Sequence, residues 1–438
     1  MNESDERKPN LSRRGFLAKA GGLVAAAAGA GLGVRAATDA IAAMKPDDLS
    51  PPGNTRNASE PFWGQHQAGI LTPPQSHTYF AAFDLVTSKR DDVIKMLRAW
   101  TAAAARMATA QTASLVGPAA DIPQADTGEA LGFPPARLTI TFGFGAGLFT
   151  KDGNDRYGLA AHRPDALVDL PRFNGDQLVD AHTGGDLSVQ ACADDPQVAF
   201  HAVRQLALAA DYVAQLRWAQ TGFITRPGPK ETPRNLMGFK DGTSNPSVTD
   251  PNAMGKFVWV GGDGPDWMRG GSYLVIRRIR MALEHWDRLT LAFQEQTVGR
   301  QKSSGAPLGG QHEFDSPDLA ATDKDGNPVI PENSHVRLAV AETNDGARIL
   351  RRPYSYNDGV NFNAERWPPW RQGMEYDAGL LFICYQQDPR TGFIKIFNKM
   401  SKYDMMNQFV THTGGGLFAC PGGIAEGGYI GQRLFESA

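Results

Sequence analysis

Cysteine is scarce in this chain, with only Cys192, Cys384 and Cys420 among 438 residues. The number is odd, the three lie far apart, and no C-x-x-C pair occurs. This pattern argues against a disulfide framework and against a zinc-ribbon site. The nine histidines are scattered, without an H-x-x-x-H pair that would indicate a metal site on one helix.

A strong charge bias is also missing. The formal net charge is -3, so no general case exists for binding nucleic acid. Hydrophobic residues make up 41% of the chain and charged residues 21%, as in ordinary globular proteins. At 438 residues the chain exceeds a typical single domain, and we expect two.

No run of apolar residues is long enough for a good membrane span of about 20 residues. The uncharged run from Ala20 to Val34 is short and rich in Ala and Gly. With Arg13, Arg14 and Lys19 before it, it fits a signal peptide over residues 1–42. The alternative is a frayed amphipathic N-terminus. We therefore predict no integral membrane span.

The paired arginines next to Phe-Leu resemble a twin-arginine signal, which exports folded proteins. Cleavage after Ala36 or after Ala42 fits the small residues there, and the sequence does not choose between them. This route predicts a periplasmic or extracellular protein that can be loaded with a cofactor before export. Residues 43–60 are rich in Pro, Asp, Asn and Ser, which indicates a linker or extended arm.

The first half of the globular part alternates strand and helix patterns. Asp195 followed by Pro196 is a good start for its second helix, because Asp caps well and Pro is tolerated at the first helical position. The predicted elements are strands at Thr78–Val86, Arg137–Phe144 and Asp186–Ala193, and helices at Arg90–Ala108 and from Pro196 onward.

The second half repeats this plan at an offset of 193 to 194 residues. Tyr273 corresponds to Tyr79, and Asp388-Pro389 corresponds to Asp195-Pro196. A duplicated strand-helix-strand-strand-helix-strand unit is the ferredoxin-like α+β pattern, with domains at 61–230 and 231–438. Antiparallel sheets with helices on their outer faces would bury their other faces against each other. The elements expected here are strands at Ser272–Met281 and Ala378–Gln386, and helices at Glu284–Glu295 and from Pro389 onward.

Two short stretches carry the candidate chemistry. The first, Gly238-Phe239-Lys240-Asp241-Gly242-Thr243, is a loop with one carboxylate between two glycines that permit tight turns. Taken alone it could equally be a surface turn. The second begins at Ser334-His335 and continues to Arg351-Arg352-Pro353.

Together these stretches resemble the dye-decolourising peroxidases, a family of haem enzymes with a GxxDG motif, an axial histidine and a following arginine. The resemblance runs from about Trp63 to the C-terminus. It is closest to the exported branch that includes the deferrochelatase/peroxidase of bacterial iron uptake. It implies one haem b per chain, two facing sheets and a homo-oligomer. The implied partners are hydrogen peroxide, small organic reductants or haem, and possible iron-uptake proteins.

The resemblance makes His335 the axial iron ligand, since haem iron needs a protein ligand on one side. The alternative for a lone histidine is a core residue bonded to backbone. Asp404 is the implied carboxylate partner of the imidazole, which would fix its tautomer and raise its basicity. A solvent-exposed aspartate at a helix start is the alternative for Asp404.

On the opposite face the resemblance places Asp241 and Arg351. Asp241 would carry a proton between the two peroxide oxygens, and an unperturbed aspartate titrates near pKa ~3.9, so an acidic optimum is expected. Arg351 would stabilise the charge that develops as the O–O bond breaks. Arg352 should point the other way if the segment is a strand. A surface strand arginine is the alternative for Arg351.

Further residues are implied as cofactor contacts. Arg300 matches the family segment near the haem propionates, and Phe382 either lines the pocket or packs in the core. The loop residues Gly238, Phe239, Lys240, Gly242 and Thr243 would lie against the haem.

The leading expectation is an exported haem peroxidase that uses hydrogen peroxide to oxidise dyes or phenolic compounds. A deferrochelatase, which removes iron and leaves the porphyrin intact, is the second. A haem carrier without turnover is the third, and the presence of both Asp241 and Arg351 argues against it.

Overall fold

The computed structural model describes residues 55–114, 125–225, 232–364 and 372–437, and these residues belong to one compact unit, Thr55–Ala438. The predicted signal peptide, most of the predicted arm and the predicted domain boundary at 230 lie outside the described residues. Within them, no helix is both long and apolar enough to cross a bilayer.

The first half forms the predicted ferredoxin-like unit. Its four antiparallel strands lie in the order β2-β3-β1-β4. The carboxylate of Asp195 caps α5 by accepting from the backbone nitrogen of Gln197 at 2.8 Å, as predicted. The elements are β1 (His77–Leu85), α3 (Arg90–Met107), β2 (Thr139–Phe144), β3 (Leu187–Ala193), α5 (Pro196–Ala209) and β4 (Ala214–Phe223).

The second half has the same topology, since its strands lie in the order β9-β5-β8-β7, again antiparallel. A short strand, β6 (Leu350–Arg351), adds to β8, and a short helix, α9 (His335–Ala339), precedes it. The main elements are β5 (Ser272–Met281), α7 (Leu283–Trp286), α8 (Leu291–Val298), β7 (Tyr354–Ala364), β8 (Gln372–Gln386), α10 (Phe393–Tyr403) and β9 (Val410–Cys420).

Two predicted helices in this half are wrong. The helix expected at Glu284–Glu295 is two short helices, because a new cap at Thr290 starts α8. The last long helix does not begin at Pro389: α10 starts at Phe393, after Gly392. The carboxylate of Asp388 binds the Arg390 guanidinium at 2.7 Å and the Arg390 backbone nitrogen, so it closes a turn and caps no helix.

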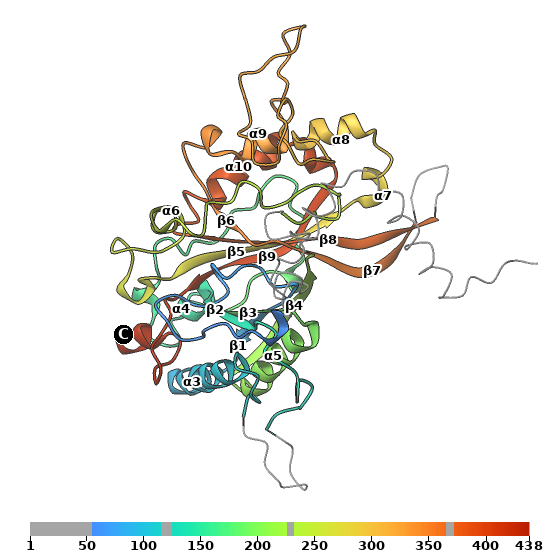
Figure 1. Ribbon diagram of the computed structural model, residues 1–438. Coiled ribbons are helices and arrows are strands. Elements are labelled where there is room, and N and C mark those ends of the chain that lie inside the picture. The colour runs from blue at the N-terminus through green and yellow to red at the C-terminus, as the bar shows by residue number, and fades with distance from the viewer. Residues whose placement is uncertain (1–54, 115–124, 226–231, 365–371, 438) are drawn as a thin grey trace, which may run out of the picture. The chain divides into compact units, whose positions relative to one another are not determined.

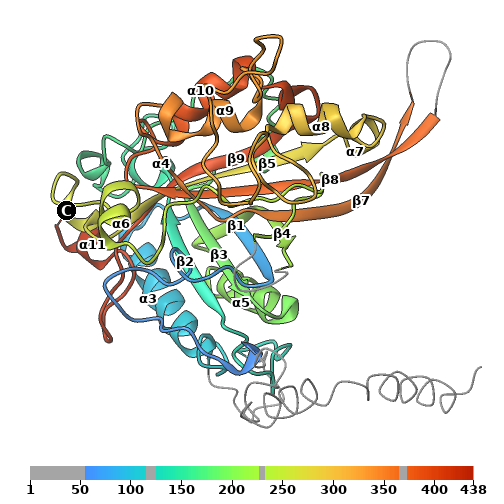
Figure 2. The ribbon, with the colours of Figure 1, turned by 45° about the horizontal axis from the view of Figure 1, so that its top comes forward.

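The two sheets face each other and meet at both edges. One pair of residues joins β2 to β9, Phe144 with Ala419, and one joins β4 to β7, Phe223 with Ser355. Between the sheets lies an apolar interior, and the helices cover the two outer faces: α3 and α5 on one side, α8, α9 and α10 on the other (Figures 1 and 2). The predicted α+β fold of duplicated ferredoxin-like units is confirmed. Interior side chains include Phe80, Trp218, Ile276, Tyr354 and Phe418.

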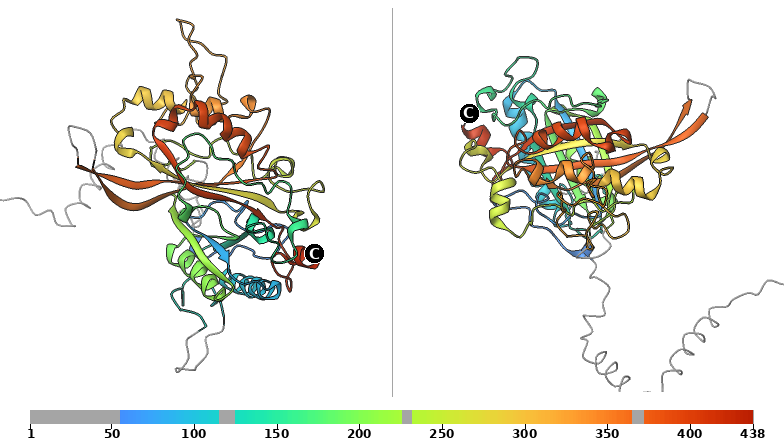
Figure 3. Two further views of the ribbon diagram at one scale, coloured as in Figure 1. Left: turned by 180° about the vertical axis from the view of Figure 1, so that it is seen from behind. Right: turned by 90° about the horizontal axis from the view of Figure 1, so that it is seen from above.

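Strands β7 and β8 continue past the sheet as a two-stranded ribbon (Figure 3). The ribbon begins where Val360 of β7 pairs with Tyr376 of β8. At this point β8 has no contact with β5, because β5 pairs with β8 only from Gly379 onward. The ribbon lies away from the outer face of the second sheet. On that face α9 and α10 stand over the strands, and the functional cavity lies there.

Candidate active site

A cavity of about 460 Å³ lies between the second sheet and the helices above it, within the usual size range of ligand sites. Its sheet side is contributed by β5, β8 and β9, and its helix side mainly by α9 and α10. Most of the lining is apolar. The sheet side includes Ile279, Met281, Leu380, Phe382, Val410 and His412, and the helix side includes His335, Val336, Ile396, Phe397 and Met400.

His335 is the first residue of α9, and its ring is held by Asp404 at the end of α10. Nδ1 of His335 lies 2.7 Å from Oδ2 of Asp404, whose other oxygen accepts from the backbone nitrogen of Met406 at 2.8 Å. The Asp404 side chain is only 3% exposed, whereas that of His335 is 37% exposed because it opens onto the cavity. Burial of the ring disfavours its charged form. The charge and hydrogen bond of Asp404 outweigh this, so the pKa of His335 is raised.

Asp241 and Arg351 form an ion pair that also lines the cavity. Nη1 of Arg351 donates to Oδ1 of Asp241 at 2.9 Å. Asn245 fixes the Arg351 backbone, because its Nδ2 donates to the Arg351 carbonyl at 2.7 Å and its Oδ1 accepts from the Arg351 nitrogen at 3.0 Å. Arg352 points to the other side of the strand and binds the Thr72 carbonyl, as side-chain alternation requires.

The glycines of the motif have the backbone conformation that glycine favours. Gly238 has φ +85° and Gly242 has φ +113°, and a Cβ on Gly238 would lie 2.7 Å from Cε of Lys302. Lys240 and Thr243 both contact Glu313. Nζ of Lys240 lies 3.3 Å from Oε2 of Glu313, and Oγ1 of Thr243 donates to Oε1 at 3.2 Å.

The other predicted contacts are distributed around the same space. Phe239 packs its ring edge-on against Trp286, 6.0 Å between centroids, and lines the cavity together with Lys240, Gly242 and Thr243. Gly238 does not line it. Phe382 lies on the cavity floor.

Arg300 is a fixed cation in the cavity wall. It is 5% exposed, and its Nη1 donates to the carbonyls of Gly305 at 2.7 Å and Glu313 at 2.9 Å. Burial and the nearby charge of Arg351 lower the pKa of Arg300 from its usual value. Arg300 makes no ion pair with any described residue, so its charge suits an anionic group of a ligand.

Two residues at the cavity are not predicted by the sequence analysis. Asn245 stands three residues after Gly242, and its position just beyond the motif is the only signal that it could anchor the strand of Arg351. His412 gave no signal, because its position depends on the pairing of β9 with β5, where His412 lies opposite Ile279.

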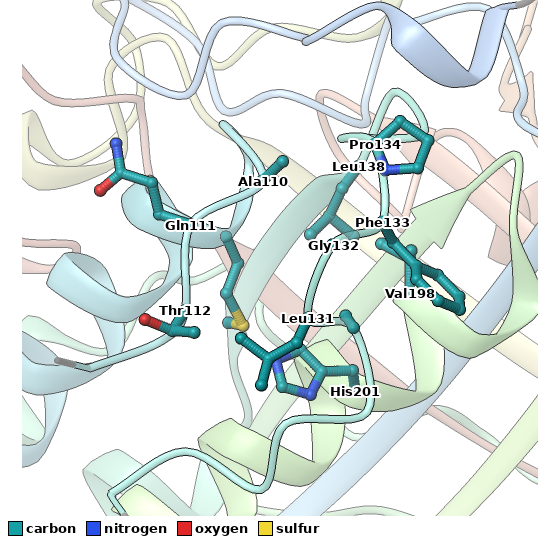
Figure 4. Close-up of a pocket in the computed structure, with 12 residues that line it drawn as sticks. Ala110, Gln111, Thr112, Leu131, Gly132, Phe133, Pro134, Leu138, Val198 and His201 are labelled. Atoms are coloured by element: carbon teal, nitrogen blue, oxygen red, sulfur yellow. The ribbon is translucent and has the colours of Figure 1, made fainter. Parts of the chain in front are cut away.

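A second, much smaller cavity of about 40 Å³ lies in the first half beside His201 (Figure 4). Both ring nitrogens of His201 are already engaged: Nδ1 lies 2.9 Å from Glu129, and Nε2 lies 3.4 Å from Asp126. This space is too small for a macrocycle, and its histidine has no free nitrogen for a metal.

The large cavity fits a haem by the chemistry of its donors. Among the described residues no group of three His, Cys, Asp or Glu is placed to hold a metal ion by itself. The cavity instead offers one carboxylate-backed imidazole, a charged pair and apolar walls, which is what a macrocycle that brings its own metal needs. Fold and cavity together fit the class of haem proteins with duplicated ferredoxin-like units.

The comparisons identify the family. The model for the Dyp-type peroxidase N-terminal domain matches residues 67–224, and the model for the C-terminal domain matches residues 232–425. The chain belongs to the Dyp-type peroxidase family, and it is a haem peroxidase, an oxidoreductase.

Relatives support this over the full length. A dye-decolorizing peroxidase of Thermobifida fusca is 39% identical over 460 residues, covering 100% of both chains. A deferrochelatase of Escherichia coli is 39% identical over 401 residues, covering 89% of this chain and 90% of the relative. The crystal structure of a DyP-type peroxidase from Streptomyces coelicolor superposes with a TM-score of 0.79 at 41% identity. It covers 88% of this chain and 100% of the other.

Proposed function

We propose that this protein uses hydrogen peroxide to oxidise dyes and phenolic donors. In this proposal His335 is the axial ligand of one haem b per chain, and Asp241 and Arg351 act on the peroxide. One observation carries the proposal: the pair His335–Asp404 and the pair Asp241–Arg351 line the same cavity.

Hydrogen bonding favours His335 over His412 as the ligand, although both line the cavity. Asp404 is an acceptor, so Nδ1 of His335 carries the proton and Nε2 keeps a lone pair for iron. Nδ1 of His412 faces Nε of Arg277 at 3.0 Å, and a guanidinium can only donate. Nε2 of a neutral His412 therefore carries the proton and cannot ligate a metal.

A bound haem would supply the iron at which peroxide is reduced. Asp241 keeps one oxygen on Arg351, and no described residue donates a hydrogen bond to the other. This carboxylate takes the proton from the first peroxide oxygen and returns it to the departing oxygen, which leaves as water. The Arg351 guanidinium offers further N–H donors to the negative charge that develops on the oxygens.

The remaining residues set the conditions for this step. Asp404 accepts from Nδ1 of His335 and so raises the basicity of the imidazole, which would favour the oxidised iron of a bound haem. The apolar walls contributed by Ile279, Phe382 and Met400 exclude water, so the charged pair acts in a medium of low polarity.

Peroxide and a dye added to the haem-loaded protein test the proposal. The wild type should bleach the dye, whereas Asp241→Ala and Arg351→Ala should retain haem and lose most of the turnover. Full activity in both variants would remove these two residues from the mechanism. The presence of both groups already favours turnover over a simple haem carrier, since binding alone requires neither.

A second candidate is deferrochelatase activity, in which haem is the substrate and its iron leaves while the porphyrin stays intact. The similarity to the deferrochelatase of Escherichia coli over most of both chains supports it. This reading extends the partners to iron-uptake proteins. Metal-free porphyrin accumulating in cells that overproduce the protein would support it, and unchanged porphyrin content would count against it.

We also propose export in the folded state by the twin-arginine route to the periplasm or beyond, and a homo-oligomeric assembly. The support for export is the Arg13-Arg14 pair before an uncharged run. Replacing both arginines by lysine should retain the protein inside the cell, measured by fractionation. Sedimentation of the purified protein tests the assembly.

A further inference from the structure

A buried ionic cluster lies beside the cavity, on the face of the second sheet that α10 covers, and includes a group that the mechanism does not use. Arg277 on β5 is 1% exposed and forms an ion pair with Asp176, whose side chain is 3% exposed. Nε of the same guanidinium donates to Nδ1 of His412 on β9 at 3.0 Å. The cluster therefore connects a buried ion pair to a cavity-lining imidazole.

The cluster is held rigidly. The rings of Phe173 and Phe397 lie 5.7 and 6.0 Å from the guanidinium, and the ring of Phe397 lies 4.6 Å from that of His412. The segment after Asp176 is tied to β9, since Gln177 donates its backbone N–H to the His412 carbonyl at 3.0 Å. A buried pair of this kind is costly to break, so the guanidinium stays where it is.

This arrangement fixes the protonation of the His412 ring. Because Arg277 only donates, Nδ1 of His412 must accept, and the proton lies on Nε2. Burial and the charge of Arg277 both lower the pKa of His412 well below its usual value, so the ring stays neutral.

The Nε2–H group faces the cavity. His412 lines the cavity, and no residue in the described part of the chain accepts a hydrogen bond from its Nε2. Nε2 is not among the fully buried side-chain atoms that lack a partner, so it has access to open space, and the cavity is the space that His412 lines. An N–H with a fixed direction and no protein acceptor is available for a ligand.

We propose that His412 is a positioning residue whose Nε2–H binds a carboxylate of the molecule in the cavity. The inference rests on the proposed haem site and deepens it. The donor cannot accept, so its partner must be an acceptor, and hydrogen bonds to a charged acceptor are about twice as strong as neutral ones. Two sources offer this group: a propionate of the porphyrin, or the carboxylate of an aromatic acid that serves as reductant.

Metal-free protoporphyrin and its dimethyl ester are the probes, because their binding does not depend on an iron ligand. A wrong assignment of His335 would therefore leave this test intact. His412→Leu removes the donor. His412→Gln keeps both an acceptor for Arg277 and a donor for the cavity, and it serves as the second variant if the leucine variant folds poorly. His77→Leu, on β1 and not lining the cavity, is the matched control.

If the porphyrin supplies the carboxylate, His412→Leu should weaken protoporphyrin binding about 10- to 100-fold. The same variant should weaken binding of the dimethyl ester much less, because an ester carbonyl is a neutral and weaker acceptor, and His412→Gln should restore protoporphyrin binding. If the reductant supplies it, porphyrin affinity stays constant. The KM for a hydroxylated aromatic acid then rises in His412→Leu, whereas the KM for its methyl ester does not.

Histidine ¹⁵N NMR of the wild type gives a readout that needs no folded variant. His412 should show the Nε2–H tautomer at every pH between about 5 and 8. Its N–H proton should move downfield when protoporphyrin, or the aromatic acid added to the porphyrin complex, binds. A protonated or Nδ1–H ring would overturn the proposal. So would a His412→Leu variant that binds both porphyrins and oxidises acid and ester as the wild type does.

Discussion

Nη1 of Arg351 lies 2.9 Å from Oδ1 of Asp241, so these two candidate catalytic groups act as one unit. Their side chains are 25% and 13% exposed, which makes the pair partly shielded from solvent. The pairing fixes one oxygen of the carboxylate and leaves the other without a donor among the described residues. A change at either residue should therefore alter the behaviour of the other.

Asp241→Asn should lower the second-order rate of reaction with peroxide roughly 100- to 10,000-fold, because the amide cannot shuttle a proton. Haem content and absorption spectrum should stay unchanged. Stopped-flow mixing with peroxide measures this rate. Arg351→Lys keeps the positive charge but loses the planar guanidinium, so its peroxide rate should lie between the rates of the wild type and of Asp241→Asn. An asparagine variant as fast as the wild type would exclude Asp241 as the proton carrier.

Asn245→Ala should reduce the peroxide rate without loss of haem. The substitution removes both hydrogen bonds to the Arg351 backbone, at 2.7 and 3.0 Å, so the strand that carries the guanidinium is less fixed. Asn245→Asp keeps the acceptor for the Arg351 nitrogen and loses the donor. Its rate should therefore fall between wild type and Asn245→Ala, and equal rates in all three proteins would show that Asn245 does not position Arg351.

Asp404→Asn should raise the Fe(III)/Fe(II) midpoint potential of the haem-loaded protein. The carboxylate raises the pKa of His335, so its loss makes the imidazole a weaker donor to oxidised iron. Asparagine has a single acceptor oxygen, so it can keep the hydrogen bond from the His335 ring or the cap at Met406, but not both. Spectroelectrochemical titration measures the shift in midpoint potential. An unchanged or lowered potential would show that Asp404 does not strengthen the iron ligand.

Glu129 should make the free energy of unfolding depend on pH. Its burial raises the pKa, but hydrogen bonds from Thr127, His201 and Arg204 outweigh this and lower it to about 2. A depressed pKa in the folded state stabilises the protein above the unfolded pKa of about 4.3, and this contribution is lost as pH falls toward 2.

Glu129→Gln should therefore destabilise the protein near neutral pH by at most about 3 kcal/mol and should flatten the fall in stability below about pH 4.3. Denaturant unfolding at several pH values measures both effects. A variant with the same acid dependence as the wild type would show that Glu129 does not cause it.

Much of the fold could be predicted from local patterns. The strand Ser272–Met281 matches its predicted bounds, and Asp195 caps its helix as expected, because both depend on adjacent residues. The repeat argument failed at Asp388, where the same Asp-Pro pair is followed by Arg390, which captures the carboxylate. Which partner a side chain finds is decided by the local structure, and a motif match does not fix it.

The same distinction, between what local patterns predict and what only the folded structure decides, applies to the site. The motif gave the residues that a loop brings together, including Asp241, and the resemblance suggested Asp404 for His335 across 69 positions of sequence. Neither could reveal His412 or its buried partner Arg277. Their contact depends on the register between β5 and β9, with its shift between Arg278 and Ile279, which no local pattern specifies.

The most direct test of the central claim, that His335 binds the iron, is the low-temperature electron paramagnetic resonance spectrum of ferric haem in the wild type and in His335→Ala with added imidazole. The account predicts a histidine-ligated signal in the wild type, its loss in the variant, and its return when imidazole occupies the space left by the side chain. A variant that keeps the wild-type signal without imidazole would contradict the claim and assign the iron to another ligand.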